Sequence, residues 1–269
     1  MSLDIKKEVE EIRALYDTAK KFNAIVAGEW GCGKTSLARS CVLPVHIDSF
    51  CPNGTDSISD MVKDGDVIAD IRWEKEDPKN PTAFDAWDAV MERRIKEGYF
   101  ENFGTYIMDE ITTLSWAIMN QRLKDVGLNR SKYPAPRTGG GKGASDTNDY
   151  VPQRIALELW IKRIINLPCN VIINGHLRFI DKEGESSKYV LNATGQAVQN
   201  IPLLFSEFYT MTARSTSKET EYQFRTKPSG KYPARSRLSR KGLLEPIEKA
   251  DIKSIMKKVG LPTEDKPKL

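Results

Sequence analysis

The stretch GEWGCGKTS, from Gly28 to Ser36, restricts the possible folds of this chain more than any other feature. It matches the pattern G-x-x-x-x-G-K-[ST], in which a glycine-rich loop turns successive backbone N–H groups toward a phosphate. The apolar run NAIVA at 23–27 precedes the loop, and a helical pattern from about Lys34 to Cys41 follows it. This order of strand, loop and helix is the context that the pattern requires. The sequence therefore predicts a nucleoside-triphosphate site on an α/β fold.

The residue types in this loop suit phosphate binding. Gly28, Gly31 and Gly33 permit backbone angles that other residues rarely adopt, so the N–H groups can converge on one anion. Lys34 reaches the β- and γ-phosphates, and the Thr35 hydroxyl is a ligand for Mg²⁺. The predicted nucleotide-binding residues are Gly28, Glu29, Trp30, Gly31, Cys32, Gly33, Lys34, Thr35 and Ser36.

The run YIMDEIT places Asp109 and Glu110 at the end of an apolar strand. Asp109 is positioned to hold the water shell of Mg²⁺, so the predicted metal residues are Thr35 and Asp109. Glu110 is positioned to polarise the attacking water as a general base. The alternative interpretation is a pair of surface acids at a strand end.

The segment NVIINGH ends with Asn174, Gly175 and His176. In an open parallel sheet, ligands bind outside the carboxyl ends of the strands, so this segment should end close to the loop and the acidic pair. We expect Asn174 or His176 to contact the γ-phosphate or water and to sense hydrolysis; an incidental turn histidine is the alternative. The predicted catalytic residues are Lys34, Glu110 and His176.

Strand and helix patterns alternate along the chain, which predicts a three-layer α/β fold with a mainly parallel central sheet covered on both faces. Further strands are predicted at 43–48, 202–211 and 221–226, the last belonging to an antiparallel C-terminal extension. A final helix is predicted from about Pro246 to Val259.

The 269 residues suit one domain of moderate size. We expect an N-terminal helix at 1–20, a core at 21–242 with a flexible loop at 129–150, and a C-terminal helix and tail at 243–269. No apolar run approaches the ~20 residues of a membrane span, and the first residues lack the pattern of a secretory signal. The four cysteines show no metal-ligand spacing, which favours a reducing cytoplasm over a zinc site or disulfides.

Together these features resemble the division of P-loop ATPases that contains RecA-like and AAA+ proteins. Within it, the chain is similar to the phage-encoded RecA-like ATPases linked to recombination and single-strand annealing. The resemblance rests on AIVAGEWGCGKTSLARS, LPVHID, YIMDEITTLSWAIMN, NVIINGH and the tail FRTKPSGKYPARSR, and covers roughly residues 20–240. It implies a RecA-like fold with ATP between neighbouring subunits of a filament or ring, and DNA-binding loops after the third and fourth strand regions.

The resemblance also implies roles for single residues. Binding of the triphosphate and Mg²⁺ is assigned to Gly28, Gly33, Lys34 and Thr35, the Mg²⁺ shell to Asp109, and sensing to His176. RecA takes its catalytic glutamate from the second strand region, where this chain has Asp48. We therefore expect Glu110 to be the base, as in AAA+ proteins. An aromatic-rich DNA-binding signature is not evident in the sequence.

Basic residues gather between Arg214 and Lys241, where Glu219 and Glu221 are the only acids. An ATP site that is open on one side needs a cation from a neighbouring subunit to stabilise charge on the γ-phosphate. The candidate cations are Lys231, Arg235 and Arg237. Contact with a nucleic-acid backbone and a simple solvated face are the alternatives.

The loop at 129–150 is rich in Gly, Ser and Pro with scattered basic residues. A structureless loop of this length is usually functional or disordered. Basic side chains suit the backbone of single-stranded DNA, and a tyrosine offers a stacking face. The candidate DNA-binding residues are Arg130, Lys132, Tyr133, Arg137 and Lys142.

The pattern as a whole indicates a Mg²⁺-dependent ATPase, with ATP and Mg²⁺ as cofactors, that acts in DNA recombination, replication or repair. We expect a homo-oligomer on single-stranded DNA, away from membranes, in the cytoplasm (of a bacterial host if the chain is phage-encoded). One alternative is an AAA+-like or packaging ATPase, although little chain follows the sensor strand for a helical lid. Others are a small-molecule kinase, which usually has an Arg-rich lid, and a nucleotide-dependent interaction protein with little turnover.

Overall fold

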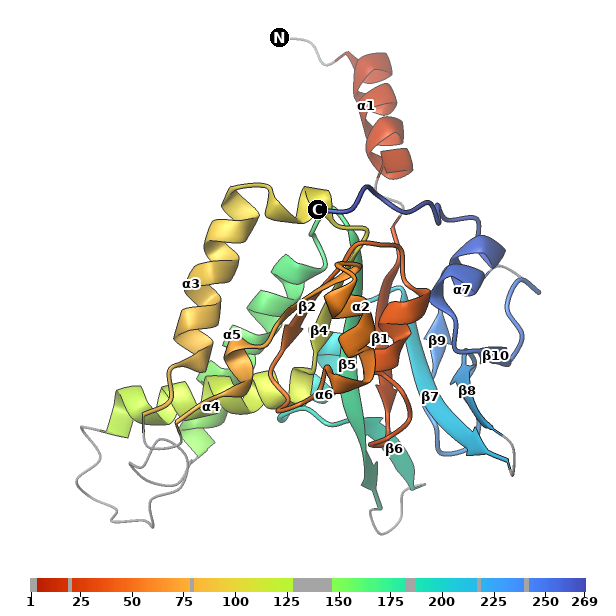
Figure 1. Ribbon diagram of the computed structural model, residues 1–269. Coiled ribbons are helices and arrows are strands. Elements are labelled where there is room, and N and C mark those ends of the chain that lie inside the picture. The colour runs from red at the N-terminus through yellow and green to blue at the C-terminus, as the bar shows by residue number, and fades with distance from the viewer. Residues whose placement is uncertain are drawn as a thin grey trace.

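A ten-stranded sheet organises the chain in a computed structural model, which describes residues 4–18, 21–77, 80–127, 147–181, 187–216, 219–239 and 242–269 (Figure 1). The strands are β1 (Asn23–Gly28), β2 (Val45–Ser49), β3 (Val67–Asp70), β4 (Thr105–Asp109), β5 (Asn170–Ile180), β6 (Lys188–Leu191), β7 (Glu207–Ser215), β8 (Thr220–Arg225), β9 (Arg235–Ser236) and β10 (Ile247–Lys249). The helices are α1 (Ile5–Thr18), α2 (Ser59–Lys63), α3 (Ala83–Lys96), α4 (Ile111–Gly127), α5 (Thr147–Ile164), α6 (Ala197–Leu203) and α7 (Ile252–Lys258). Short 3₁₀ turns are η1 (Thr35–Ser40), η2 (Asp56–Ile58), η3 (Arg72–Glu74) and η4 (Tyr99–Asn102).

The strand order is β10-β8-β7-β1-β5-β4-β2-β3, with β6 paired to β5 and β9 paired to β7. From β7 to β3 every pairing on this path is parallel, whereas β6, β8, β9 and β10 pair antiparallel. The expected fold class is therefore confirmed: a three-layer α/β fold with a mainly parallel sheet and a C-terminal antiparallel extension. In Figure 1 the parallel strands run downward, so their carboxyl ends lie at the lower edge.

Two apolar cores cover the sheet, one on each face. On β1, Ile25 and Ala27 face the core formed with α3, α4, α5 and α6, whereas Ala24 and Val26 face the core formed with η1 and α7. All four side chains are fully buried. This two-sided burial explains why the strand is a continuous apolar run with no alternation.

Three predicted elements differ from the structure. The helix predicted from about Lys34 to Cys41 is present at Thr35–Ser40, but it is the 3₁₀ helix η1 and not an α-helix. The strand predicted at 202–211 begins only at Glu207, since α6 extends to Leu203. The final helix was predicted to start at about Pro246, but Ile247–Lys249 forms β10, which pairs with β8, and the helix α7 starts at Ile252.

The Asp251 side chain explains where α7 starts. Asp251 Oδ1 accepts a hydrogen bond of 2.8 Å from the backbone N–H of Ser254, which makes it the N-cap of the helix. Ile252, Ile255 and Met256 are then buried in the core. The segment 243–269 thus contributes both a strand and a packed helix to the body, while its assignment as a separate region stays a prediction.

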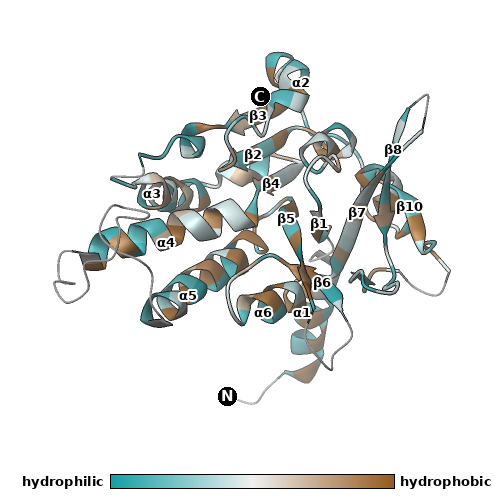
Figure 2. Cartoon of the chain, turned by 90° about the horizontal axis from the view of Figure 1, so that it is seen from below, coloured by the Kyte–Doolittle hydropathy of each residue, from teal (hydrophilic) through white to brown (hydrophobic). Residues whose placement is uncertain are grey.

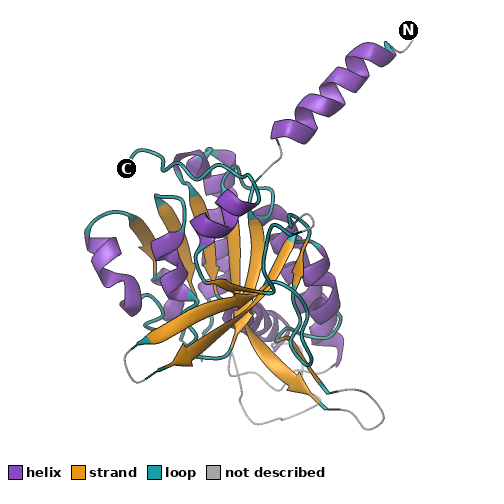
Figure 3. Ribbon diagram, turned by 90° about the vertical axis from the view of Figure 1, so that its right-hand side faces the viewer, coloured by secondary structure: helices purple, strands orange, loops and turns teal. Residues whose placement is uncertain are grey.

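The helix α1 stands away from the body at the amino end of β1 (Figures 1 and 3). Its apolar residues Ile5, Val9, Ile12 and Leu15 are all exposed. Figure 2 shows hydrophobic (brown) and hydrophilic (teal) segments alternating along α1. Among the described residues, no helix has the length and apolar content needed to cross a membrane.

Candidate nucleotide site

The loop after β1 has the backbone that the glycines predicted. Gly31 and Gly33 have positive φ angles of 75° and 87°, in the left-handed region that side chains disfavour. At Gly28 a Cβ atom would lie 2.5 Å from the carbonyl oxygen of Met211 on β7. Gly31 and Gly33 are therefore required for their backbone conformation, and Gly28 is required because β7 passes too close to leave room for a side chain.

Lys34 folds back into the loop. Its Nζ donates hydrogen bonds to the carbonyl oxygens of Glu29, at 2.9 Å, and Gly28, at 3.3 Å. The same atom lies 3.4 Å from His176 Nδ1, and the side chain is buried. The ammonium group is thus held at the centre of the loop, which is the position expected of a group that contacts phosphate oxygens.

Asp109 ends β4 beside the loop, although β5 separates β4 from β1 in the sheet. Its carboxylate accepts hydrogen bonds from Thr35 Oγ1, at 2.7 Å, and from Asn174 Nδ2, at 2.9 Å. Burial raises the pKa of the Asp109 carboxyl, and the two hydrogen bonds oppose this rise. The structure therefore brings the predicted metal residues into direct contact.

Glu110 follows at the start of α4 and is buried. His176 Nε2 lies 2.8 Å from Glu110 Oε2, and His176 Nδ1 lies 3.3 Å from the Gly28 carbonyl oxygen. The two sensor candidates thus have different contacts: Asn174 binds Asp109, whereas His176 binds Glu110 and lies next to Lys34. The predicted catalytic residues Lys34, Glu110 and His176 form one contiguous group.

A pocket of about 370 Å³ opens over this group. Its lining residues are Trp30, Gly31, Gly33, Lys34, Thr35, Ser36, Cys51, Gly54, Ser57, Asp109, Glu110, His176 and Tyr222. Four of them, Cys51, Gly54, Ser57 and Tyr222, were not predicted from the sequence. For Tyr222 the sequence held one signal: residues two apart in a strand share a face, so Tyr222 lies on the same face as the buried Phe224. The ring of Tyr222 would lie 2.8 Å from a Cβ at Gly33.

The remaining loop residues have separate environments. The Trp30 side chain is 88% exposed at the rim, and Glu29 contributes its backbone carbonyl to Lys34. Cys32 is buried, with its Sγ 3.9 Å from Lys34 Nζ, and burial raises the pKa of its thiol. Ser36 Oγ lies 3.3 Å from Ser57 Oγ. The four cysteines are free thiols.

The donor set suits Mg²⁺ and a nucleotide. Hydroxyl and carboxylate oxygens, which Thr35 and Asp109 supply, are the ligands that Mg²⁺ prefers. Asn174 Oδ1 beside them is buried and has no hydrogen-bond partner among the described residues. The loop has no room for side chains at Gly28 and Gly33, where the backbone must approach a phosphate. The residues present therefore fit Mg²⁺ and a triphosphate.

Residues 20–238 match a protein family described as an AAA domain. The chain belongs to this AAA domain family. The AAA domain is of the P-loop ATPase class, whose loop binds a nucleotide, typically with Mg²⁺. No curated protein matches the chain.

Solved structures with some similarity include the flagellar accessory protein FlaH from Methanocaldococcus jannaschii, at 16% identity and a TM-score of 0.40, covering 76% of each chain. Another is a KaiC-like protein, PH0186, from Pyrococcus horikoshii OT3, at 11% identity and a TM-score of 0.39, covering 76% of this chain and 77% of the other.

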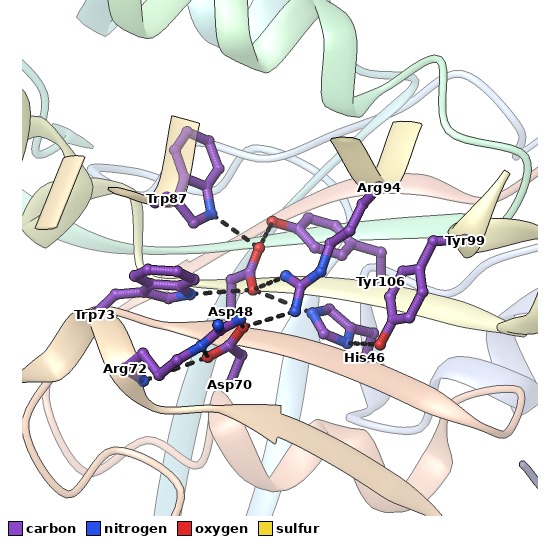
Figure 4. Close-up of polar contacts among 9 residues, drawn as sticks. All are labelled: His46, Asp48, Asp70, Arg72, Trp73, Trp87, Arg94, Tyr99 and Tyr106. Atoms are coloured by element: carbon purple, nitrogen blue, oxygen red, sulfur yellow. Dashed lines mark hydrogen bonds and ion pairs between the residues drawn. The ribbon is translucent and has the colours of Figure 1, made fainter. Parts of the chain in front are cut away.

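Asp48 lies outside the nucleotide pocket of the AAA domain. It is fully buried, and its carboxylate accepts hydrogen bonds from Trp87 Nε1, Tyr106 Oη and Arg94, at 2.9, 2.9 and 3.1 Å (Figure 4). His46 Nε2 lies 3.1 Å from the same carboxylate. Asp48 is therefore part of an internal network and does not take part in the nucleotide pocket.

Arg94 makes this network an ion-pair cluster. Its guanidinium bridges Asp48 and Asp70, the latter at 2.7 Å (Figure 4). His46, Asp48 and Asp70 lie close enough together to hold a metal ion, but Arg94 already supplies the positive charge. Burial alone would raise the pKa of Asp48, and the charges of His46 and Arg94 together with the donated hydrogen bonds hold it below its ordinary range.

The candidate cations from the C-terminal region do not line the pocket of their own chain. Arg235 donates hydrogen bonds to the carbonyl oxygens of Pro202 and Phe205, and Arg237 donates to that of Leu203. Lys231 is exposed. Their contribution to a neighbouring subunit stays a prediction. The candidate DNA-binding residues Arg130, Lys132, Tyr133, Arg137 and Lys142 lie outside the described residues.

Proposed function

We propose that this AAA domain is a Mg²⁺-dependent ATPase that uses Glu110 as its general base. One observation carries the proposal: the Thr35–Asp109 contact of 2.7 Å and the Glu110–His176 contact of 2.8 Å face the same pocket. A hydroxyl and a carboxylate for the metal thus lie next to a carboxylate that can accept a proton. A binding protein without turnover has no need of the second carboxylate.

The chain's own groups have distinct parts in the proposed reaction. Lys34 neutralises charge on the β- and γ-phosphates, and Thr35 and Asp109 would hold Mg²⁺, which would supply further neutralisation of phosphate charge. Glu110 accepts the proton of that water, and His176 fixes the orientation of the Glu110 carboxylate. A cation from a neighbouring subunit, with Lys231, Arg235 and Arg237 as candidates, completes the charge stabilisation.

We also propose that the ATPase acts as a homo-oligomer, ring or filament, on single-stranded DNA during recombination, replication or repair. The sequence resemblance supports the DNA role, as does the excess of basic residues between 214 and 239. The exposed apolar residues of α1 support assembly with further copies of this chain, because an isolated amphipathic helix gains stability by burying such a face.

ATP hydrolysis measured without DNA, with single-stranded DNA and with duplex DNA tests this function. Glu110→Gln should lower kcat by roughly a hundredfold or more, because it removes the base and keeps the shape of the side chain. Glu97→Gln on the exposed end of α3 is the matched control and should hydrolyse ATP normally. Normal turnover by Glu110→Gln would refute the base assignment. A wild-type protein that neither binds single strands nor responds to them would refute the DNA role.

A further inference from the structure

Three aromatic side chains that are distant in sequence form a cluster beside the β5–β6 hairpin. The ring centroids of Tyr189 and Tyr232 are 4.8 Å apart at an interplanar angle of 8°, so the two rings stack. Phe179 lies 5.1 Å from Tyr189 and is tilted by 56°. The Phe179 side chain is 45% exposed, which leaves the end of this row of rings open to solvent. The sequence did not reveal the cluster because its members come from three separate segments.

Backbone contacts fix the cluster. Phe179 and Tyr189 are register partners in the antiparallel pair of β5 and β6. The Tyr189 N–H donates a 2.8 Å hydrogen bond to the carbonyl oxygen of Lys231, and Ser229 and Tyr232 pair across a tight turn. Gly230 within that turn has a φ of 56°, which glycine adopts without strain. The three rings are therefore held by hydrogen-bonded backbone from two sides.

Two cations border the rings. Lys231 Nζ lies 4.9 Å from the centre of the Phe179 ring, and the Arg225 guanidinium lies 5.3 Å from that of Tyr232. Arg225 Nε is buried without a hydrogen-bond partner in the part of the chain that the structure describes. A hollow of about 510 Å³ is lined by these residues together with Ser229 and Gly230. The site thus combines aromatic surface, positive charge, an unused donor and an adjoining space.

We propose that this cluster binds single-stranded DNA, with unpaired bases stacking on its rings and backbone phosphates paired with Lys231 and Arg225. Every base has a flat face that an aromatic side chain can stack on, whereas the bases of a duplex already stack on one another. Basic residues beside aromatic rings are the combination that tracks a flexible, charged strand. This inference rests on the proposed function, because it names the place where the proposed DNA partner attaches.

The cluster lies at the same end of the sheet as the nucleotide pocket. β5 carries His176, which contacts Glu110, and continues directly to Phe179. Figure 1 shows the β5–β6 hairpin extending beyond the carboxyl ends of the neighbouring strands. DNA bound to this hairpin would therefore lie close to the loop that holds the phosphates, without occupying the pocket itself.

Fluorescence anisotropy with a labelled oligothymidylate of roughly 30 nucleotides tests the site in the full chain. Phe179→Ala and Tyr232→Ala should each weaken binding roughly tenfold, because each removes a stacking surface. Tyr232→Phe keeps the ring and should bind within about twofold of wild type. Lys231→Gln should weaken binding and make the slope of log affinity against log salt concentration shallower by about one, because one phosphate contact is lost. Lys63→Gln on α2 should change neither the affinity nor this slope.

Three outcomes would overturn the inference: unchanged binding by both alanine variants, equal losses for Tyr232→Phe and Tyr232→Ala, or equally tight binding of duplex DNA. ATP hydrolysis without DNA is measured on the same preparations and should match wild type in Phe179→Ala, Tyr232→Ala and Tyr232→Phe, which also shows that each of these variants folds. If wild type binds single strands but the variants bind as well as it does, this site is wrong and the DNA role stands. If wild type hydrolyses no ATP yet the variants lose DNA binding, the ATPase proposal fails and this site stands.

Discussion

His176 Nε2 lies 2.8 Å from Glu110 Oε2, while the other ring nitrogen of His176 lies 3.4 Å from Lys34 Nζ. One imidazole on β5 thus contacts both the proposed base and the phosphate-binding lysine. β5 is inserted between the strand that leads into the loop and the strand that carries the acids. The sheet order therefore explains why a residue of β5, the fifth strand along the sequence, lies at the centre of the site.

We predict that His176→Ala lowers kcat by roughly tenfold to a hundredfold, with little change in the affinity for ATP. The reason is that Glu110 would lose the group that orients it, while the loop would keep its backbone donors and Lys34. Steady-state kinetics and binding of a fluorescent ATP analogue separate these effects. His176→Asn, which keeps a hydrogen-bond donor, should recover part of kcat. An equal loss in both substitutions with weakened ATP binding would contradict a positioning role.

The second prediction concerns the hydroxyl group of Thr35. Thr35→Val keeps the side-chain shape but removes the metal ligand and the donor to Asp109, so hydrolysis should need a much higher Mg²⁺ concentration or be lost. Thr35→Ser keeps the hydroxyl and should stay close to wild type. The measurement is a Mg²⁺ titration of the hydrolysis rate at saturating ATP. Identical titrations for the two variants would show that this hydroxyl does not bind the metal.

Some of the site could be predicted from sequence because its parts are local patterns at strand ends. Lys34, Asp109 and His176 each follow an apolar run, and a parallel sheet brings such ends together. Tyr222 could not be placed in the same way, because its approach to Gly33 depends on how the antiparallel strand β8 lies against the loop. The sequence pattern placed η1 correctly to within a residue, but it did not show that this helix is of the 3₁₀ type.

The buried ion-pair cluster of Asp48, Asp70 and Arg94 was even harder to predict from the sequence. Asp48 ends an apolar run and gave no sign of an internal role, because Arg94 reaches it from α3 across 46 residues of sequence. We predict that Arg94→Met lowers the free energy of unfolding by roughly 3–5 kcal/mol, since two buried carboxylates would lose their counter-charge. Arg72→Met, which removes a largely exposed partner of Asp70, should cost about 1 kcal/mol or less. Urea denaturation measures both, and equal costs would contradict this assignment.

The same cluster should make the fold sensitive to acid. The pKa of Asp48 is held below its ordinary value, so the unfolded chain binds more protons than the folded one once the pH falls below about 4. The stabilisation that ionised Asp48 contributes is therefore fully present above that pH, and it is lost as the pH falls toward the lowered pKa of the folded state. Urea midpoints between neutral pH and about pH 3 should show this decline. In Arg94→Met, where the folded pKa rises toward that of the unfolded chain, the two states bind more similar numbers of protons and the decline should be smaller; an unchanged profile would refute the linkage.

The exposed face of α1 leads to the last prediction. Ile12 and Leu15 are 58% and 69% exposed on a helix that stands off the body, so their burial requires another surface. If that surface belongs to another copy of this chain, the double substitution Ile12→Glu and Leu15→Glu should reduce the assembly to monomers, because it places charges in an apolar contact. Light scattering after size exclusion, with and without a non-hydrolysable ATP analogue, measures the mass.

Glu10→Gln and Glu11→Gln together change the polar residues of the same helix and should leave the assembly intact. Binding of ATP should persist in the monomeric variant, since the residues that hold the phosphates come from one chain. Turnover should fall if a cation from the neighbour completes the site. An assembly that survives the Ile12 and Leu15 substitutions would show that α1 is not its interface.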